Sequence, residues 1–188
     1  NLYLSHPMKA YLFIIGLAGL LACQTDNQKQ TKSENKSSET MNITQQAAET
    51  GQKNKATVRQ FFELLEKENI TDLVNLFAEN GQQVNPYASG LFPEGAKGKA
   101  AIKAYWEPVP GNFAGMAFPI HEIYAMEDPH IVFVKYSGKI KLKNEAGTYE
   151  NEYYSTFKFD SEGKIIEYVE IFNPIVAARG FGLLDKIK

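Results

Sequence analysis

The order of patterns along the sequence predicts an α+β fold in which helices come first and an antiparallel sheet follows. Between residues 56 and 106, apolar residues recur at the three-to-four spacing of amphipathic helices. After residue 115, β-branched and aromatic runs alternate with turn residues, which is typical of strands in a meander. We therefore expect three N-terminal helices packed across one face of a strongly bent antiparallel sheet.

Composition narrows the classes of function. The 188 residues are 44% hydrophobic, as in a globular protein, and the formal net charge is −2. This charge provides no basic surface for nucleic acid, so no nucleic acid partner is expected. Cys23 is the only cysteine, and no histidines and cysteines are clustered at ligand spacing. We accordingly expect neither a metal site nor a cofactor.

The first residues carry processing information rather than fold. Met8 and Lys9 precede an apolar run from residue 10 to 22, which has the charged start and short hydrophobic core of a secretory signal. The run is too short for a bilayer span and ends in Leu-Leu-Ala-Cys, which resembles the lipobox of bacterial lipoproteins. A plain signal or an uncleaved anchor are the alternatives. Residues 1–7 precede this signal, and we expect them to be a non-native extension without structure.

The lipobox resemblance implies that Cys23 is lipidated, which places the protein in the cell envelope with its partner, the lipid bilayer. Residues 24 to 54 are rich in polar residues and contain no aromatic residue. Such a segment buries too little apolar surface to offset the entropy of ordering. We therefore predict a signal peptide over 8–22, a lipidated and disordered tether over 23–54 with a reach of roughly 30 Å, and one folded domain over 55–188.

Three helices are expected in the first half of the domain. The first begins at Ala56, and its apolar positions are Val58, Phe61, Phe62, Leu64 and Leu65. Thr71 or Asp72 caps a second helix that runs through Phe77 and ends near Asn80-Gly81. A short strand over Gln82–Tyr87 and a Gly/Pro-rich loop lead to a third helix, Gly98–Trp106, which Pro108 and Pro110 stop.

Four strands are expected in the second half. They cover residues 117–126, 131–143, 148–160 and 164–174, with turns at 144–147 and 161–163. In the second strand apolar residues alternate with lysines at 135, 139, 141 and 143. We interpret these lysines as a solubilising face, with a phosphate site as the alternative.

The last strand is the most informative, because it carries a carboxylate in an apolar row. Two-residue alternation places Glu170 on the same side as Ile166, Tyr168 and Phe172. A carboxylate there either loses solvation, which raises its pKa, or finds a hydrogen-bond partner in a pocket. The alternatives are that this face is wet or that Glu170 lies at a strand end. We expect its carboxylate to lie within reach of a hydroxyl such as that of Tyr105 or Tyr153.

These residues together resemble a known family. The segment 76–81 before the short strand and Gly98-Lys99 at the third helix are similar to the SnoaL-like branch of the nuclear transport factor 2-like superfamily. Segments 149–152, 163–165 and 169–174 most resemble the phenazine-biosynthesis A/B proteins. The resemblance implies a cone-shaped fold with a pocket at one end, a homodimer formed sheet to sheet, and a glutamate, here Glu170, that acts on a bound substrate.

The sequence departs from that family at one position. The family pairs the glutamate with a histidine on the helix before the sheet, whereas this helix contains Tyr105 and no histidine. The superfamily also includes ketosteroid isomerase, in which a tyrosine and a neutral carboxylic acid form an oxyanion hole. The resemblance therefore implies isomerase- or cyclase-like acid/base chemistry without metal.

Aromatic and amide side chains supply candidates for the pocket wall. Aromatic walls with a few polar groups suit a flat, partly polar ligand. We take as ligand-binding candidates Asn85, Tyr87, Tyr105, Trp106, Tyr136, Asn151, Tyr153, Tyr168 and Phe172, with Glu170 as the catalytic candidate. Ordinary core and dimer interface are the alternative for the aromatic residues, and shaping a loop is the alternative for Asn85. His121 and His130 fit surface positions better than catalysis.

The sequence thus predicts an exported, membrane-tethered protein whose domain binds a small, partly aromatic or polycyclic molecule at Glu170. The alternative is a non-catalytic ligand-binding or protein-interaction module of the same fold.

Overall fold

The computed structural model describes residues 19–143 and 147–186, and its side chains from residue 36 onward except residue 37. Within this part the chain forms two compact units, which divide between Gln45 and Gln46. Several predicted features lie outside the described residues. They are the extension over 1–7, most of the signal over 8–22, the side chain of Cys23 and most of the turn at 144–147. No helix in the described segments is long and apolar enough to cross a membrane.

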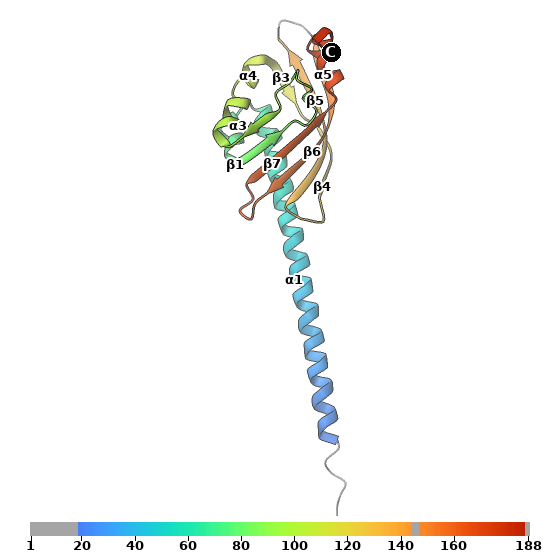
Figure 1. The fold of residues 1–188 in the computed structure, drawn as a ribbon. Coiled ribbons are helices and arrows are strands. Elements are labelled where there is room, and N and C mark those ends of the chain that lie inside the picture. Colours follow the sequence, from blue (N-terminus) through green and yellow to red (C-terminus); the bar gives the residue numbers. More distant parts are fainter. Residues whose placement is uncertain (1–18, 144–146, 187–188) are drawn as a thin grey trace, which may run out of the picture. The chain divides into compact units, whose positions relative to one another are not determined.

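Helices precede most of the sheet, as predicted (Figure 1). In chain order the elements are α1 (Gly19–Glu66), α2 (Ile70–Asn75), β1 (Phe77–Val84), β2 (Gly95–Lys97), α3 (Lys99–Trp106), α4 (Val109–Asn112), β3 (Phe113–Ala117), β4 (Ile120–Ala125), β5 (Ile131–Leu142), β6 (Thr148–Phe159), β7 (Ile165–Phe172), α5 (Pro174–Gly180) and a 3₁₀ turn (Leu184–Lys186).

One curled sheet contains all the strands, in the order β2-β1-β7-β6-β5-β3, with β4 also paired to β5. The expectation of a purely antiparallel sheet is wrong at one pair, because β1 runs parallel to β7. The predicted strand 117–126 is divided, since β3 pairs with the last part of β5 and β4 with its first part. Pro119 lies at this break and has no N–H to continue a ladder.

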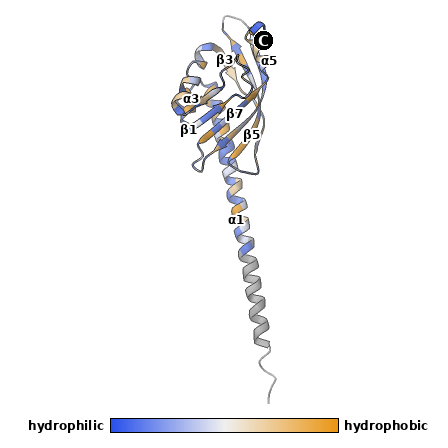
Figure 2. Ribbon diagram, in the orientation of Figure 1, coloured by the Kyte–Doolittle hydropathy of each residue, from blue (hydrophilic) through white to orange (hydrophobic). Residues whose placement is uncertain are grey.

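The core lies between the C-terminal part of α1 and the inner face of the sheet. Of the apolar positions of the predicted helix, Leu64 is only partly buried. The other four are at most 2% exposed, namely Val58, Phe61, Phe62 and Leu65. Phe61 makes edge contacts with the rings of Phe77, Trp106, Phe157 and Tyr168. Strands in Figure 2 carry both hydrophilic and hydrophobic residues, as expected for a sheet with one covered face. Phe62 and Leu65 on this face of α1 also border a cavity.

The domain begins earlier than residue 55, and the prediction of a disordered tether up to residue 54 is wrong for its last part. Residues from Gln46 onward belong to the folded unit and form part of α1. Gly51 allows close approach of Ala125, because an added Cβ would lie 2.7 Å from the Ala125 Cβ. Asn54 is 1% exposed and donates from Nδ2 to the Pro129 carbonyl at 2.9 Å. Residues 24–45 are also helical, as part of α1, and their Gln, Lys and Glu residues favour a helix.

Other boundaries differ for local reasons. Asn69, not Thr71 or Asp72, caps α2, because its side chain accepts a hydrogen bond from the Asp72 N–H. Segment 77–81 is strand rather than helix, because Phe77 is buried and pairs with Ile165 of β7. Four elements were not predicted, namely β2, α4, α5 and the 3₁₀ turn. Helix α5 begins with Asn173 as its cap and Pro174 in its first turn, a common helix start.

Candidate functional site

Two adjoining cavities lie beside Glu170. We call them the large lobe, about 340 Å³, and the small lobe, about 130 Å³. Both are lined by Pro93, Tyr105, Ile140, Tyr153 and Glu170, so these five residues mark the junction of the lobes. Their combined volume lies within the range of sites for small organic molecules.

The walls of the two lobes differ in polarity. The large lobe is mostly apolar, and its further lining includes Phe62, Leu65, Trp106, Phe113, Met116 and Phe118. The small lobe adds Asn85 and Tyr149 to the apolar Phe92, Phe172, Ala177 and Phe181. An apolar chamber joined to a smaller chamber with polar groups suits a ligand with a ring system and a polar substituent.

Two tyrosine hydroxyls hold the Glu170 carboxyl group. Oε1 of Glu170 lies 2.9 Å from the Tyr168 hydroxyl and 3.2 Å from the Tyr136 hydroxyl. These two hydroxyls lie 2.8 Å from each other, so the three oxygens form a triangle. Tyr168 and Glu170 lie two residues apart on β7 and therefore share one face of the sheet. Tyr136 comes from β5, which is separated from β7 by β6. The parity argument is therefore correct for Tyr168, Glu170 and Phe172.

Parity fails before Tyr168. Ile165 is fully buried in the core, although it was expected on the opposite side from Tyr168. The reason is a register shift in the pairing of β6 with β7, between Lys158 and Phe159. Such an irregularity adds a residue and inverts the faces beyond it.

The hydrogen bonds leave one oxygen of Glu170 free. The Tyr136 and Tyr168 hydroxyls both donate to Oε1. Oε2 of Glu170 has no hydrogen-bond partner among the described residues, and the residue borders both lobes. Oε2 is therefore the oxygen that is free to contact a ligand.

Burial changes the pKa values of the ionisable groups at the site. Loss of hydration raises the pKa of Glu170, and the hydrogen bonds from Tyr168 and Tyr136 only partly oppose this. Burial, together with the charge of Glu170, also raises the pKa values of Tyr136, Tyr153 and Tyr168 well above the usual value. The tyrosines consequently remain neutral hydrogen-bond donors, whereas Glu170 can gain or lose a proton closer to neutral pH than an ordinary glutamate.

A second polar group faces the junction from α3. Tyr105 accepts a hydrogen bond of 2.9 Å from Nδ2 of Asn85. Asn85 is 4% exposed, and its Nδ2 also donates to the Pro93 carbonyl at 2.9 Å. Burial and then the charge of Glu170 raise the pKa of Tyr105, while the bond from Asn85 lowers it.

A third group connects the small lobe to α5. The hydroxyls of Tyr149 and Tyr153 lie 3.1 Å apart, and Asn151 donates to the Tyr149 hydroxyl at 2.8 Å. Asn151 also donates to the carbonyl of Asn173, the cap of α5, at 2.9 Å. Asn151 therefore holds the cavity wall in place from behind and does not line either lobe.

Most of the predicted site residues meet at this cavity. Seven of them line one or both lobes, namely Asn85, Tyr105, Trp106, Tyr153, Tyr168, Phe172 and Glu170. Tyr136 donates a hydrogen bond to Glu170. Tyr87 does not, because its side chain is 56% exposed and lines neither lobe. The expected hydroxyl partner of Glu170 is also different, since Tyr168 and Tyr136 bind it rather than Tyr105 or Tyr153.

Sequence reasoning missed several apolar wall residues. Phe62 and Leu65 lie on the buried face of α1, and Ile140 lies on the inner face of β5. Helical spacing for Phe62 and Leu65, and alternation for Ile140, indicated that these residues are buried. A buried residue that borders a cavity recurs at the same sequence spacing as one in the core. Phe181, which follows α5, could not be placed because that helix was not predicted.

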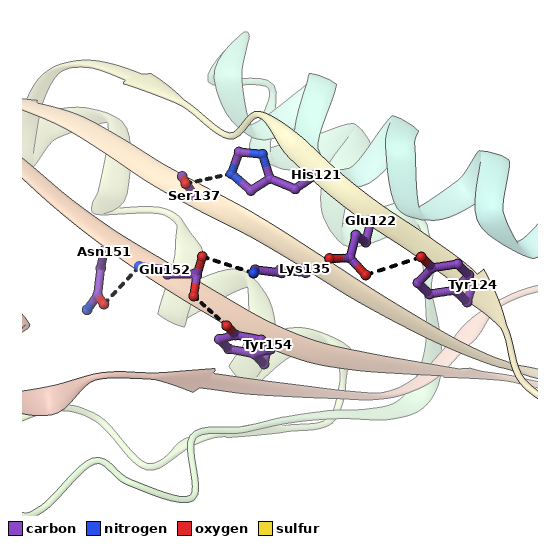
Figure 3. A network of polar contacts seen from close by, with 8 residues as sticks. All are labelled: His121, Glu122, Tyr124, Lys135, Ser137, Asn151, Glu152 and Tyr154. Carbon is purple, nitrogen blue, oxygen red and sulfur yellow. Dashed lines mark hydrogen bonds and ion pairs between the residues drawn. The ribbon is translucent and has the colours of Figure 1, made fainter.

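The opposite face of the sheet carries a separate polar network (Figure 3). His121 on β4 lies 2.7 Å from the Ser137 hydroxyl, and Lys135 on β5 pairs with Glu152 at 3.3 Å. Lys135 alternates along β5 with buried residues, so it belongs to a solvated face, as interpreted from the sequence. Within the described segments no three His, Cys, Asp or Glu side chains are placed to hold a metal ion.

Relatives of known structure share this fold. A phenazine biosynthesis-related protein of Pseudomonas aeruginosa superposes with a TM-score of 0.62 at 22% identity, covering 74% of this chain and 91% of that one. A Bacillus subtilis protein, provisionally described as an isomerase, has a TM-score of 0.65 at 24% identity, with coverage of 71% and 96%. TerC, crystallised with polyporic acid, has a TM-score of 0.58 at 17% identity, with coverage of 71% and 98%.

Comparison of sequences identifies the family. The uncharacterized protein YesE of Bacillus subtilis (strain 168) is 25% identical over 126 residues, which cover 67% of this chain and 85% of that protein. The model of the SnoaL-like domain family matches residues 58–168, from the buried face of α1 to Tyr168 beside the site. The chain therefore belongs to the SnoaL-like domain family.

Proposed function

We propose that the domain binds a small, partly aromatic or polycyclic organic molecule in the two lobes, with Glu170 as its binding and acid/base group. One observation carries this proposal. The Glu170 carboxyl group is partly buried, is held by two neutral hydroxyls, and borders both lobes of a mostly apolar cavity. A carboxyl group is costly to bury, and one with a raised pKa beside a cavity is a recognised sign of a functional site.

The chemistry suited to this arrangement is proton transfer. In its ionised form Glu170 can accept a proton from a ligand at Oε2, and in its neutral form it can return one. An acid or base with a pKa close to the working pH is the most effective catalyst of such steps. Isomerisation and cyclisation of polycyclic compounds proceed by steps of this kind.

The names of similar proteins support the class of ligand. TerC was crystallised with polyporic acid. SalBIII, which has a TM-score of 0.56 at 19% identity, is described as an epoxide hydrolase/cyclase-like enzyme that acts in pyran ring formation. A fold alone does not determine function, so the site residues must carry the argument.

Ligand binding can be tested with polyporic acid and a panel of flat polycyclic ketones and phenols, measured by thermal shift and by tryptophan fluorescence of Trp106, the only tryptophan. We expect binding to the wild type, weaker binding to Glu170→Gln, and unchanged binding to Glu150→Gln. Glu150 is a matched control because it lies at an exposed position of β6. Ligand conversion followed by absorbance separates an enzyme from a non-catalytic binding module. Failure of every compound to bind would refute the proposal.

We also propose that the chain is exported and anchored to a membrane through lipidated Cys23. The sequence Leu-Leu-Ala-Cys after an apolar run supports this. A homodimer through the outer face of the sheet is a further proposal, supported by the exposed Tyr124, Met126 and Tyr154 side chains.

A further inference from the structure

The hydrogen bonds of Asn85 determine which way the Tyr105 hydroxyl points its hydrogen. The Pro93 carbonyl can only accept, so the Asn85 atom that faces it must be the amide nitrogen, Nδ2. Nδ2 has two hydrogens, and the second is directed at the Tyr105 hydroxyl oxygen, 2.9 Å away. Tyr105 is therefore the acceptor in this contact.

Asn85 is fixed firmly enough for this direction to hold. Its backbone N–H donates to the Glu94 carbonyl at 2.8 Å, and its carbonyl accepts from Ala88 at 3.2 Å. Its Oδ1 lies 3.4 Å from Nε2 of Gln83 on β1. Rotation of the amide by half a turn would place two acceptors against each other at Pro93, which is unfavourable.

The hydrogen of the Tyr105 hydroxyl consequently remains available. No acceptor for it lies among the described residues, and Tyr105 lines both lobes at their junction. Burial keeps this phenol neutral, so its hydrogen is retained over the usual pH range. Glu170, at the same junction, presents Oε2, which has no protein donor in the part of the chain that is described.

We propose that Tyr105 is a ligand-binding residue that donates a hydrogen bond to a carbonyl oxygen of the ligand, and that Asn85 is the residue that positions this donor. This inference rests on the proposed function and makes it more specific. The ligand class is a polycyclic ketone or quinone, with its carbonyl at the junction of the lobes and its rings in the large lobe. A polar hydrogen of the ligand would face Glu170.

The test uses two probes that differ by one oxygen. 9-Fluorenone is a flat tricyclic ketone, and fluorene has the same rings without the carbonyl. A net hydrogen bond of about 1 kcal/mol predicts that the wild-type chain binds fluorenone about fivefold more tightly than fluorene. In Tyr105→Phe this preference should disappear while fluorene binds unchanged. Tyr87→Phe removes the same atom from an exposed ring outside the cavity and should keep the preference.

Infrared spectroscopy of bound fluorenone tests the hydrogen bond directly. The carbonyl stretching band should lie at a lower frequency in the wild type than in Tyr105→Phe, because a donor weakens the C=O bond. Asn85→Leu should reduce the preference for fluorenone and broaden the band. The double variant should lose no more than Tyr105→Phe alone, because both residues act through one hydrogen bond.

The possible failures are distinguishable. If neither probe binds the wild type, the proposed function fails and this inference fails with it. If both probes bind and Tyr105→Phe keeps both the preference and the band position, only the assignment of Tyr105 is refuted. If the losses of Tyr105→Phe and Asn85→Leu add fully in the double variant, the positioning role of Asn85 is refuted. Should Asn85→Leu fail to fold, the Tyr105→Phe comparison still decides the donor.

Discussion

Replacing Glu170 by Gln should make the domain more stable at neutral pH. The change keeps the shape of the side chain and an oxygen that accepts from the Tyr136 and Tyr168 hydroxyls, but it removes the ionisable group. Burial raises the pKa of Glu170 above its ordinary value of 4.5, so the folded state binds the proton more tightly than the unfolded state. The wild type therefore loses stability as the pH rises from about 4.5 to the folded-state pKa, and the loss is constant above it.

The size of the effect follows from two opposing contributions. Each unit by which the pKa is raised corresponds to about 1.4 kcal/mol of lost stability above the folded-state pKa. The raised pKa is the net result of the burial penalty, which raises it, and of the hydrogen bonds from the two tyrosines, which lower it. We expect Glu170→Gln to raise the free energy of unfolding by about 1 to 2 kcal/mol at pH 8, or about 3 to 6 °C in melting temperature for a domain of this size.

Urea denaturation followed by circular dichroism between pH 4 and pH 8.5 measures this difference. The stability of the wild type should fall relative to the variant as the pH rises, and the two curves should nearly meet at pH 4. The control Glu150→Gln, on the exposed face of β6, should give a small and pH-independent difference. A Glu170→Gln variant that is less stable at pH 8 and equal at pH 4 would show that the folded state stabilises the carboxylate, and would refute the argument.

Three further changes test other parts of the structure. Phe61→Ala should lower the free energy of unfolding by about 3 to 5 kcal/mol in a denaturant titration, because Phe61 is fully buried; a loss below 1 kcal/mol would contradict its central place in the core. Asn54→Ala should cost about 1 to 3 kcal/mol in the same assay, because it removes a buried side chain that donates to the partly buried Pro129 carbonyl; no change would place the start of the domain after residue 54. Cys23→Ser should move the protein from the membrane to the soluble fraction with an unchanged melting temperature, and retention in the membrane pellet would refute the lipid anchor.

The fold was predictable from the sequence because periodicity reports burial directly. Val58, Phe61 and Phe62 recur at helical spacing, and all three are buried against the sheet. The strand 131–143 alternates as expected, since Val132 and Val134 are fully buried. What could not be predicted depends on contacts between distant segments. The parallel pairing of β1 with β7, which turns residues 77–81 into a strand, is one such contact.

The polar residues of the N-terminal segment show the limit of composition as evidence. Low hydrophobicity indicated disorder up to residue 54, because the argument considered only the segment itself. Residues 46–54 are ordered by a surface that lies far away in the sequence, at Ala125, Pro129 and Glu162. Gly51 makes close packing against Ala125 possible, and a small residue contributes little to a hydrophobicity count.

The residues of the site were largely predictable, but the hydrogen bonds between them were not. Glu170 was identified because one charged residue interrupts an apolar row, which a single strand can reveal. Tyr136 was among the candidates for the pocket wall, but its hydrogen bond to Glu170 joins two strands that are not consecutive in the sequence. The pairing of β5 with β6 and of β6 with β7 brings Tyr136 to Tyr153 and Tyr153 to Phe172, and so places Tyr136 below Glu170.

Tyr168 and Tyr105 differ in what they can do for a ligand. The hydrogen of Tyr168 is directed at Glu170, so this residue acts on the ligand only by adjusting the carboxyl group. The hydrogen of Tyr105 has no protein acceptor among the described residues, because Asn85 already donates to its oxygen. A ligand carbonyl that binds Tyr105 would lie at the junction of the lobes, where Glu170 Oε2 is also free. Polarisation of a carbonyl on one side and proton transfer on the other are the two elements of enolisation, and this cavity places a suitable residue for each.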